Sequence, residues 1–154
     1  MTDTISESTN ETLGTDMNLE VVTLPVSDVE RAKRFYLSLG WRLDIDLVVS
    51  DEFRTVQFTP PHSNCSIQFG RGGTSAEPGS AAGLILVVKD IDAARADLVR
   101  RGIDVGEIAV SKPPAFESEP GRSYFARATF SDPDGNRWQL QEITTRLPGR
   151  EWDN

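Results

Sequence analysis

The chain has 154 residues, of which 38% are hydrophobic, so it is long enough for one domain with a buried core. Its formal net charge is −8, from 24 acidic and 16 basic side chains. This acidic balance argues against nucleic acid as a partner, because affinity for phosphates comes largely from Lys and Arg. No apolar stretch is long enough to span a bilayer, and a lone cysteine, Cys65, cannot form an intrachain disulfide. We therefore expect a soluble, cytoplasmic protein with no membrane partner.

The first residues differ in composition from the rest of the chain. Residues 1–16 are dominated by Thr, Ser, Glu, Asp and Asn, a composition typical of disordered segments. They lack the basic start and apolar centre of a signal peptide. The apolar pattern begins at Met17, so we expect a disordered tail at 1–16, a single domain at 17–143 and a C-terminal tail at 144–154.

A short motif occurs twice. The segment Val-Ser-Asp-Val-Glu-Arg-Ala at 26–32 returns 62 positions later as Val-Lys-Asp-Ile-Asp-Ala-Ala at 88–94. Each copy follows an apolar run and precedes a helix-length segment that ends at Gly40 or Gly102. Two copies predict two facing modules, at about 17–69 and 83–143, since a solenoid needs at least about three repeats to bury its faces.

The first module reads as a strand, a helix and three strands. Residues 19–26 are rich in β-branched side chains and predict a strand. Ser27 and Glu30 have the spacing of a capping box, which predicts a helix that ends at Gly40. Strands are then expected at 41–47, 52–58 and 64–69, separated by polar or proline-containing turns.

The second module repeats this order after a glycine-containing linker at 70–83. Residues 84–88 predict a strand, Asp90 caps a helix, and strands follow at 103–110, 123–130 and 137–143. The sequence Asp-Pro-Asp-Gly-Asn at 132–136 predicts a tight turn. The irregular stretch at 111–122 is long for a connection, and long loops of this kind often act as lids.

The element order and three motifs carry a family resemblance. The strand ends read Leu-Pro-Val-Ser-Asp and Val-Val-Lys-Asp, and the Asp-Pro-Asp-Gly-Asn turn precedes Trp-Gln-Leu-Gln. Over residues 17–143 the chain resembles the vicinal oxygen chelate superfamily, which includes glyoxalase I, extradiol dioxygenases, fosfomycin-resistance enzymes and bleomycin-binding proteins. The resemblance implies an α+β fold in which two βαβββ modules form a curved mixed sheet around a concave cleft. It also implies a homodimer, and the linker permits the modules to pair within one chain or with a partner chain.

Enzymes of this family usually hold a divalent metal at four places on the first and last strands of the modules. Here the resemblance places Val21 and Gly83 on the first strands, and Gln68 and Gln139 on the last. Val and Gly offer no side-chain donor, and two neutral amides do not compensate the charge of a divalent cation. We therefore expect no metal and no other cofactor. His62, the single histidine, lies in a Pro-Pro-His-Ser-Asn turn and is interpreted as a solvated loop residue.

The alternation of side chains along the strands predicts which residues face the cleft. It indicates an apolar side and an amide-lined side, as expected for a small-molecule site. The predicted ligand-binding residues are Val21, Thr23, Trp41, Phe58, Gln68, Gly83, Ile85, Phe125, Arg127, Gln139 and Gln141. Two competing interpretations remain at this stage: the amides of Gln68 and Gln139 satisfy backbone groups at strand ends, and Trp41 and Phe58 pack in the core.

The favoured hypothesis is a metal-independent binding protein that resembles drug- or metabolite-sequestering proteins of the bleomycin-resistance type and takes a hydrophobic or aromatic small molecule. The alternative is a glyoxalase-like enzyme, an isomerase, lyase or dioxygenase, with a degenerate or non-standard metal site. Metal-free turnover needs a general acid or base. The candidates are Arg127 and Arg137, which stay protonated, and Tyr124 if it faces the cleft. No catalytic residue is assigned.

Overall fold

The computed structural model describes residues 14–153, and its first module has the predicted element order. This module comprises β1 (Val21–Thr23), α2 (Val29–Ser38), β2 (Arg42–Val48), β3 (Arg54–Thr59) and β4 (Ser66–Arg71). The strands form a sheet in the order β1-β4-β3-β2, with β1 parallel to β4 and the other neighbours antiparallel. Helix α2 covers one face of this first sheet, packing on β3 and β4.

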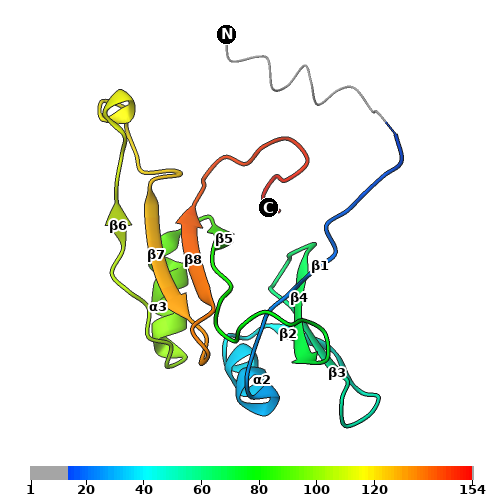
Figure 1. The fold of residues 1–154 in the computed structure, drawn as a ribbon. Helices are drawn as coiled ribbons and strands as arrows, with labels where there is room; N and C mark the ends of the chain where they lie inside the picture. Colours follow the sequence, from blue (N-terminus) through cyan, green and yellow to red (C-terminus); the bar gives the residue numbers. More distant parts are fainter. Residues whose placement is uncertain (1–13, 154) are drawn as a thin grey trace.

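The second module repeats the arrangement (Figure 1). It comprises β5 (Leu84–Val88), α3 (Ile91–Arg100), β6 (Ala109–Val110), the short 3-10 helix η1 (Pro114–Phe116), β7 (Ala126–Ser131) and β8 (Arg137–Glu142). The second sheet has the order β5-β8-β7-β6, with β5 parallel to β8. Helix α3 packs on β7 and β8. The fold is therefore α+β, as predicted, and each βαβββ module contributes one open, mixed four-stranded sheet.

One predicted strand is much shorter than expected. Residues 103–110 were predicted as a strand, but only Ala109 and Val110 pair with β7. The guanidinium of Arg95 on α3 donates hydrogen bonds to the backbone oxygens of Val105 and Gly106, at 3.1 and 2.8 Å. These carbonyls are therefore satisfied by a side chain from the helix and not by a strand neighbour.

The helices begin at aspartates in both modules. The Asp28 carboxylate accepts from the backbone N–H of Arg31 at 3.0 Å, and Asp90 accepts from Ala93 at 3.1 Å. The prediction that Ser27 caps α2 is wrong, because its hydroxyl donates to Asp134 at 2.5 Å.

Both modules contribute to one hydrophobic core, and α2 joins them. The ring of Tyr36 lies 5.5 Å from Phe69 of the first sheet and 6.2 Å from Trp138 of the second, measured between centroids. Trp41 and Trp138 meet edge to face at 5.1 Å. Figure 1 shows α2 between the lower ends of the two sheets. Burial of this aromatic cluster therefore holds the modules together.

The Asp-Pro-Asp-Gly-Asn turn forms the polar part of the same junction. Asp132 is 5% exposed, and one of its carboxylate oxygens accepts from the Tyr36 hydroxyl at 2.9 Å and from the Asn136 amide at 2.8 Å. The Asn136 amide also donates to the backbone oxygen of Pro25 at 2.9 Å. The most family-specific motif of the chain thus links the end of the first strand to the second module.

Among the described residues, no helix combines the length and the apolar character needed to cross a membrane.

Candidate ligand-binding site

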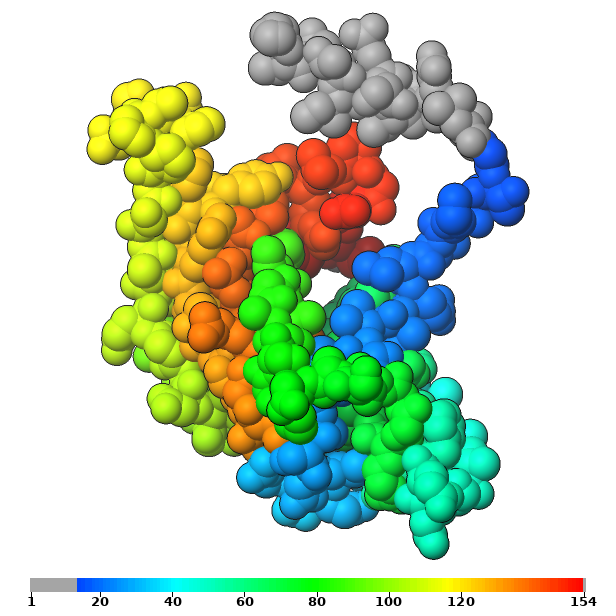
Figure 2. Space-filling model, in the orientation of Figure 1, coloured from blue at the N-terminus to red at the C-terminus, as the bar shows by residue number. Residues whose placement is uncertain are grey.

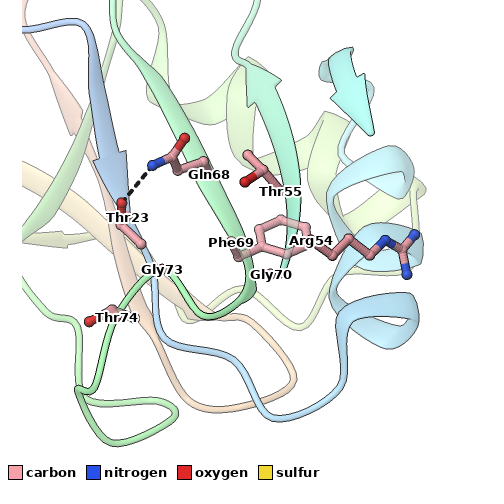
Figure 3. A pocket seen from close by; sticks show the side chains of 8 residues that line it. All are labelled: Thr23, Arg54, Thr55, Gln68, Phe69, Gly70, Gly73 and Thr74. Atoms are coloured by element: carbon pink, nitrogen blue, oxygen red, sulfur yellow. Dashed lines mark hydrogen bonds between the residues drawn. The ribbon is translucent and has the colours of Figure 1, made fainter. Parts of the chain in front are cut away.

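Each sheet has one face under a helix and one face turned away from it, which we call the open face. On the first sheet, Phe58 and Phe69 lie under α2, so their neighbours along the strands belong to the open face. Cross-strand pairing aligns Thr23, Gln68 and Gln57 in one row of that face. The Gln68 amide nitrogen donates to the Thr23 hydroxyl at 2.9 Å. Figure 3 shows the side-chain oxygen of Gln68 directed away from Thr23.

A shallow pocket lies on this open face. Its lining residues are Thr23, Arg54, Thr55, Gln68, Phe69, Gly70, Gly73 and Thr74. In Figure 3 the side chain of Arg54 points away from the pocket, toward α2. It forms ion pairs with Glu30 of α2 and Asp46 of β2. Small and polar groups from β1, β3, β4 and the start of the linker therefore form the pocket.

A hydrogen-bonded polar cluster lies at the other end of the same face. The Thr59 hydroxyl bonds to the Asp44 carboxylate and lies 2.6 Å from the Ser66 hydroxyl. Arg42 donates to Asp44 at 2.5 Å. Burial alone would raise the pKa of Asp44, but the hydrogen bonds from Thr59 and Arg42 outweigh it and lower the pKa. The carboxylate is therefore held ionised within a structural network.

The sequence did not identify Asp44 as an open-face residue, because the direction of its side chain depends on a register shift. The pairing of β2 with β3 slips between Leu43 and Ile45, and Asp44 lies at that bulge. A β-bulge re-aims a side chain in a way that period-two alternation does not predict. No sequence signal marks the position.

The second sheet carries three aligned rows on its open face. The first row is Ile85, Gln139 and Thr129, the second is Val87, Gln141 and Arg127, and the third pairs Arg137 with Ser131. Ile85 is 53% exposed, a large fraction for an isoleucine in a strand. The Gln141 amide donates to the backbone oxygen of Tyr124 at 2.9 Å, so this side chain satisfies a backbone group. This face combines exposed apolar and hydrogen-bonding groups.

Aromatic residues adjoin the end of this face near the loop at 111–122. Phe125 contacts Phe116 of η1, with ring centroids 5.4 Å apart. Tyr124 has a positive φ of 74° and is 41% exposed. Such a conformation is uncommon for a bulky residue and marks local strain. Arg122 closes the loop by binding Glu142 and Asp92, at 2.9 and 2.5 Å.

Figure 2 shows the molecule hollowed between β5, the segment that leads into β1 and the C-terminal segment. The C-terminal segment folds back here, because the Trp152 indole donates to the Ile143 backbone oxygen at 2.9 Å. Arg146 stacks over the Trp152 ring at 4.8 Å.

Most of the candidate site residues lie on or beside the open faces, in two groups. Val21, Thr23 and Gln68 lie on the first sheet, and Ile85, Phe125, Arg127, Gln139 and Gln141 lie on or beside the second. Gly83 precedes β5 with a φ of 76°, and a β-carbon built there would meet no atom within 4 Å. Trp41 and Phe58 are 7% and 0% exposed in the core around Tyr36, so we leave them out of the site.

The donor set at the four metal positions implied by the resemblance does not fit a divalent cation. It consists of Val21 and Gly83, which have no donor atom, and the amides of Gln68 and Gln139. Glu142, the carboxylate on β8, accepts instead from the backbone N–H of Ile91 at 3.0 Å on the helix-covered side. Residues 14–153 contain no group of three His, Cys, Asp or Glu side chains arranged to hold a metal ion.

Comparisons with known proteins agree on one family. A family model described as the glyoxalase/bleomycin resistance protein/dioxygenase superfamily matches residues 18–140. Among solved structures, the chain is similar to TnmS3, an antibiotic binding protein from Streptomyces sp. CB03234, with 30% identity over 85% of this chain and 99% of that one, and a TM-score of 0.68.

Two further solved structures are similar to this chain, with comparable sequence identities and TM-scores. One is a glyoxalase/bleomycin resistance protein from the same Streptomyces, with 32% identity, coverage of 80% of this chain and 99% of that one, and a TM-score of 0.62. The other is a superfamily member from Sphaerobacter thermophilus, with 31% identity, coverage of 82% and 98%, and a TM-score of 0.60. No curated protein matches the chain.

Proposed function

Because the chain belongs to the glyoxalase/bleomycin resistance protein/dioxygenase superfamily, we propose that it is a metal-independent binding protein that sequesters a hydrophobic or aromatic small molecule on its open faces. The composition of these faces carries the proposal. At the positions where the family's enzymes hold a metal, this chain has one apolar side chain, one glycine and two neutral amides. These residues are Val21, Gly83, Gln68 and Gln139. Such groups suit an organic ligand, which gains affinity from buried apolar area and takes its orientation from a few hydrogen bonds.

The similarity to TnmS3 supports an antibiotic as one class of ligand. That protein binds an antibiotic, and the chain matches nearly its full length at 30% identity. We therefore propose a role in drug sequestration, which requires binding without turnover.

We also propose that the protein acts as a homodimer. The edge strand β2 exposes Ile45, Leu47 and Val48 by 44%, 52% and 60%. An apolar strand edge of this kind promotes aggregation unless another surface covers it. A second copy would cover it, and light scattering during size exclusion should give twice the chain mass. A monomeric mass that persists at high micromolar concentration would contradict the dimer.

A metal-free enzyme of the same fold has less support. General-base catalysis needs a group with a pKa near the working pH. Burial alone would raise the pKa of Asp44 on the first sheet, but the hydrogen bonds from Thr59 and Arg42 lower it. This makes Asp44 a weak base at neutral pH.

The proposal is tested with protein dialysed against EDTA. A panel of aromatic antibiotics and hydrophobic metabolites is screened by thermal shift, because a ligand that binds only the folded state raises the melting temperature. We expect at least one compound to stabilise the metal-free protein and to be recovered chemically unchanged. Gln139→Ala should weaken that binding, whereas Asn64→Ala, in an exposed turn, should not. Stabilisation that requires added Zn²⁺ or Mn²⁺, or conversion of the compound, would contradict the proposal.

A further inference from the structure

The open face of the second sheet has a charge opposite to that of the whole chain. Its strand positions on β7 and β8 are Arg127, Thr129, Ser131, Arg137, Gln139 and Gln141. These positions hold two guanidinium groups and no carboxylate, although the chain has a net charge of −8. The acidic residue of β8, Glu142, points to the helix-covered side. A cationic surface on an acidic protein is a local feature that the overall composition does not explain.

The two arginines also differ from most others in the chain in having no carboxylate partner. Arg54 binds Asp46 and Glu30, and Arg122 binds Glu142 and Asp92. Within residues 14–153, neither Arg127 nor Arg137 takes part in an ion pair or a side-chain hydrogen bond. Because acidic side chains outnumber basic ones by 24 to 16, a shortage of carboxylates is not the reason. Both guanidinium groups are available to a ligand.

The register sets the spacing of these charges. Arg127 pairs with Gln141 and Arg137 pairs with Ser131, so the two arginines lie one row to either side of the row formed by Thr129 and Gln139. Neighbouring strands lie roughly 5 Å apart, and residues two apart on one strand are separated by roughly 7 Å. Long guanidinium side chains at such positions can reach the same group above the Gln139 row.

Apolar groups border the same rows. Ile85 pairs with Gln139 on the β5 side and is 53% exposed. Phe125 adjoins the other end, backed by Phe116 of the loop at 5.4 Å. A flat molecule lying over the rows between Ile85 and Phe125 would come within reach of Arg127, and a group at its Gln139 end would come within reach of Arg137.

We propose that the open face of the second sheet recognises an ionised acid group on a planar aromatic ligand. The guanidinium groups bind the anionic oxygens, because their planar donors match carboxylate geometry, while Ile85 and Phe125 contact the ring system. This inference rests on the proposed function and narrows it from aromatic molecules in general to aromatic acids.

Two matched probes test this charge preference. 2-Naphthoate carries a carboxylate, and 2-naphthalenemethanol has the same ring system with a neutral group. Isothermal titration of the full-length, EDTA-dialysed protein should show 2-naphthoate binding roughly tenfold more tightly, because hydrogen bonds between charged groups exceed neutral ones. Raising the salt concentration should weaken the binding of 2-naphthoate but not that of 2-naphthalenemethanol.

Substitution of each arginine tests whether the preference for the anionic probe comes from this open face. Arg127→Gln and Arg137→Gln should each reduce the affinity for 2-naphthoate by about three- to tenfold and leave that for 2-naphthalenemethanol unchanged. Arg34→Gln removes an exposed arginine from α2 and is the control, with no expected change in either affinity. Circular dichroism verifies that each variant is folded.

The other outcomes separate this inference from the proposed function. Equal binding of both probes, or binding of 2-naphthoate that survives both substitutions, would overturn the anion preference and leave a neutral aromatic site. Failure of both probes to bind would overturn the inference together with the proposed binding of aromatic molecules on this open face.

Discussion

At the scale of single residues, the Tyr36 hydroxyl connects the two modules. It donates to Asp132 at 2.9 Å and accepts from the Trp138 indole at 3.0 Å, in a region where Tyr36 is fully buried. Burial in the first place, and then the nearby Asp132 carboxylate, raise the pKa of Tyr36 far above its usual range, so the hydroxyl stays neutral. A buried neutral hydroxyl that both donates and accepts is suited to a structural role.

Tyr36→Phe should therefore destabilise the protein. The substitution leaves the Trp138 N–H without an acceptor and removes one donor from Asp132, which should lower the free energy of unfolding by about 1–3 kcal/mol. Urea unfolding measures the change, and Tyr124→Phe, at a 41% exposed tyrosine, is the control with little expected effect. Equal stability of the two variants would show that the hydroxyl does not hold the junction.

The ion pairs of Asp46 lead us to expect that the stability of the protein depends on pH. It accepts from Arg54 at 3.0 and 2.9 Å and from Lys33 of α2 at 2.7 Å, and these bonds, that from Arg54 first, lower its pKa well below the usual value. A carboxyl group whose pKa is lowered by folding stabilises the protein above its unfolded pKa of about 3.9. That contribution is lost as the pH falls through the folded value.

Asp46→Asn should thus lower the free energy of unfolding by about 1 kcal/mol at pH 7. Below roughly pH 4 the difference in free energy of unfolding between the variant and the unmodified protein should shrink. Urea unfolding at a series of pH values measures it, with the exposed Asp51→Asn as control. A difference that stays constant down to pH 2 would argue against the charged form of Asp46 as the source.

At the scale of elements, the contact between β3 and β4 depends on Gly70. A β-carbon at this position would lie 1.7 Å from the backbone oxygen of Arg54, far inside van der Waals contact. Gly73, which lines the same pocket, would place a β-carbon 3.9 Å from its nearest neighbour, the side chain of Thr23. Alanine substitutions at these two glycines therefore distinguish the effect of backbone crowding from the effect of filling the pocket.

Gly70→Ala should force β3 and β4 apart and lower the free energy of unfolding by about 3 kcal/mol or prevent folding. Gly73→Ala should leave stability within about 0.5 kcal/mol of the original. Thermal unfolding followed by circular dichroism compares the two. A well-folded Gly70→Ala protein with unchanged stability would mean that the strands lie farther apart than described.

The elements also show which features a sequence can predict. Strand β5 and the capped start of α3 were predicted at their observed positions, because apolar runs and an aspartate cap are local signals. The strand expected at 103–110 is much shorter than predicted, because Arg95 on α3 satisfies the carbonyls of Val105 and Gly106. Asp44 was missed because a bulge sets its direction, and the core position of Phe58 was left open because aromatic residues suit either face.

At the scale of the molecule, the core and the candidate site lie on opposite sides of the same strands. Aromatic packing around α2 holds the two modules together, while the open faces present amides, small residues and exposed apolar groups. In the described residues, β1 and β5 are both edge strands, and each has a single partner within the chain. We propose that the ligand binds the open faces, whereas the second copy that we propose covers the exposed edge of β2.

The central claim is that an organic ligand binds the open faces without a metal. The most direct measurement is a titration of metal-free, isotope-labelled protein with 2-naphthoate, followed by amide NMR shifts. We predict saturable shifts that centre on Ile85, Arg127 and Gln139, with little change at Asn64 in its exposed turn. Absence of saturable shifts at these residues, or shifts that appear only after Zn²⁺ is added, would contradict it.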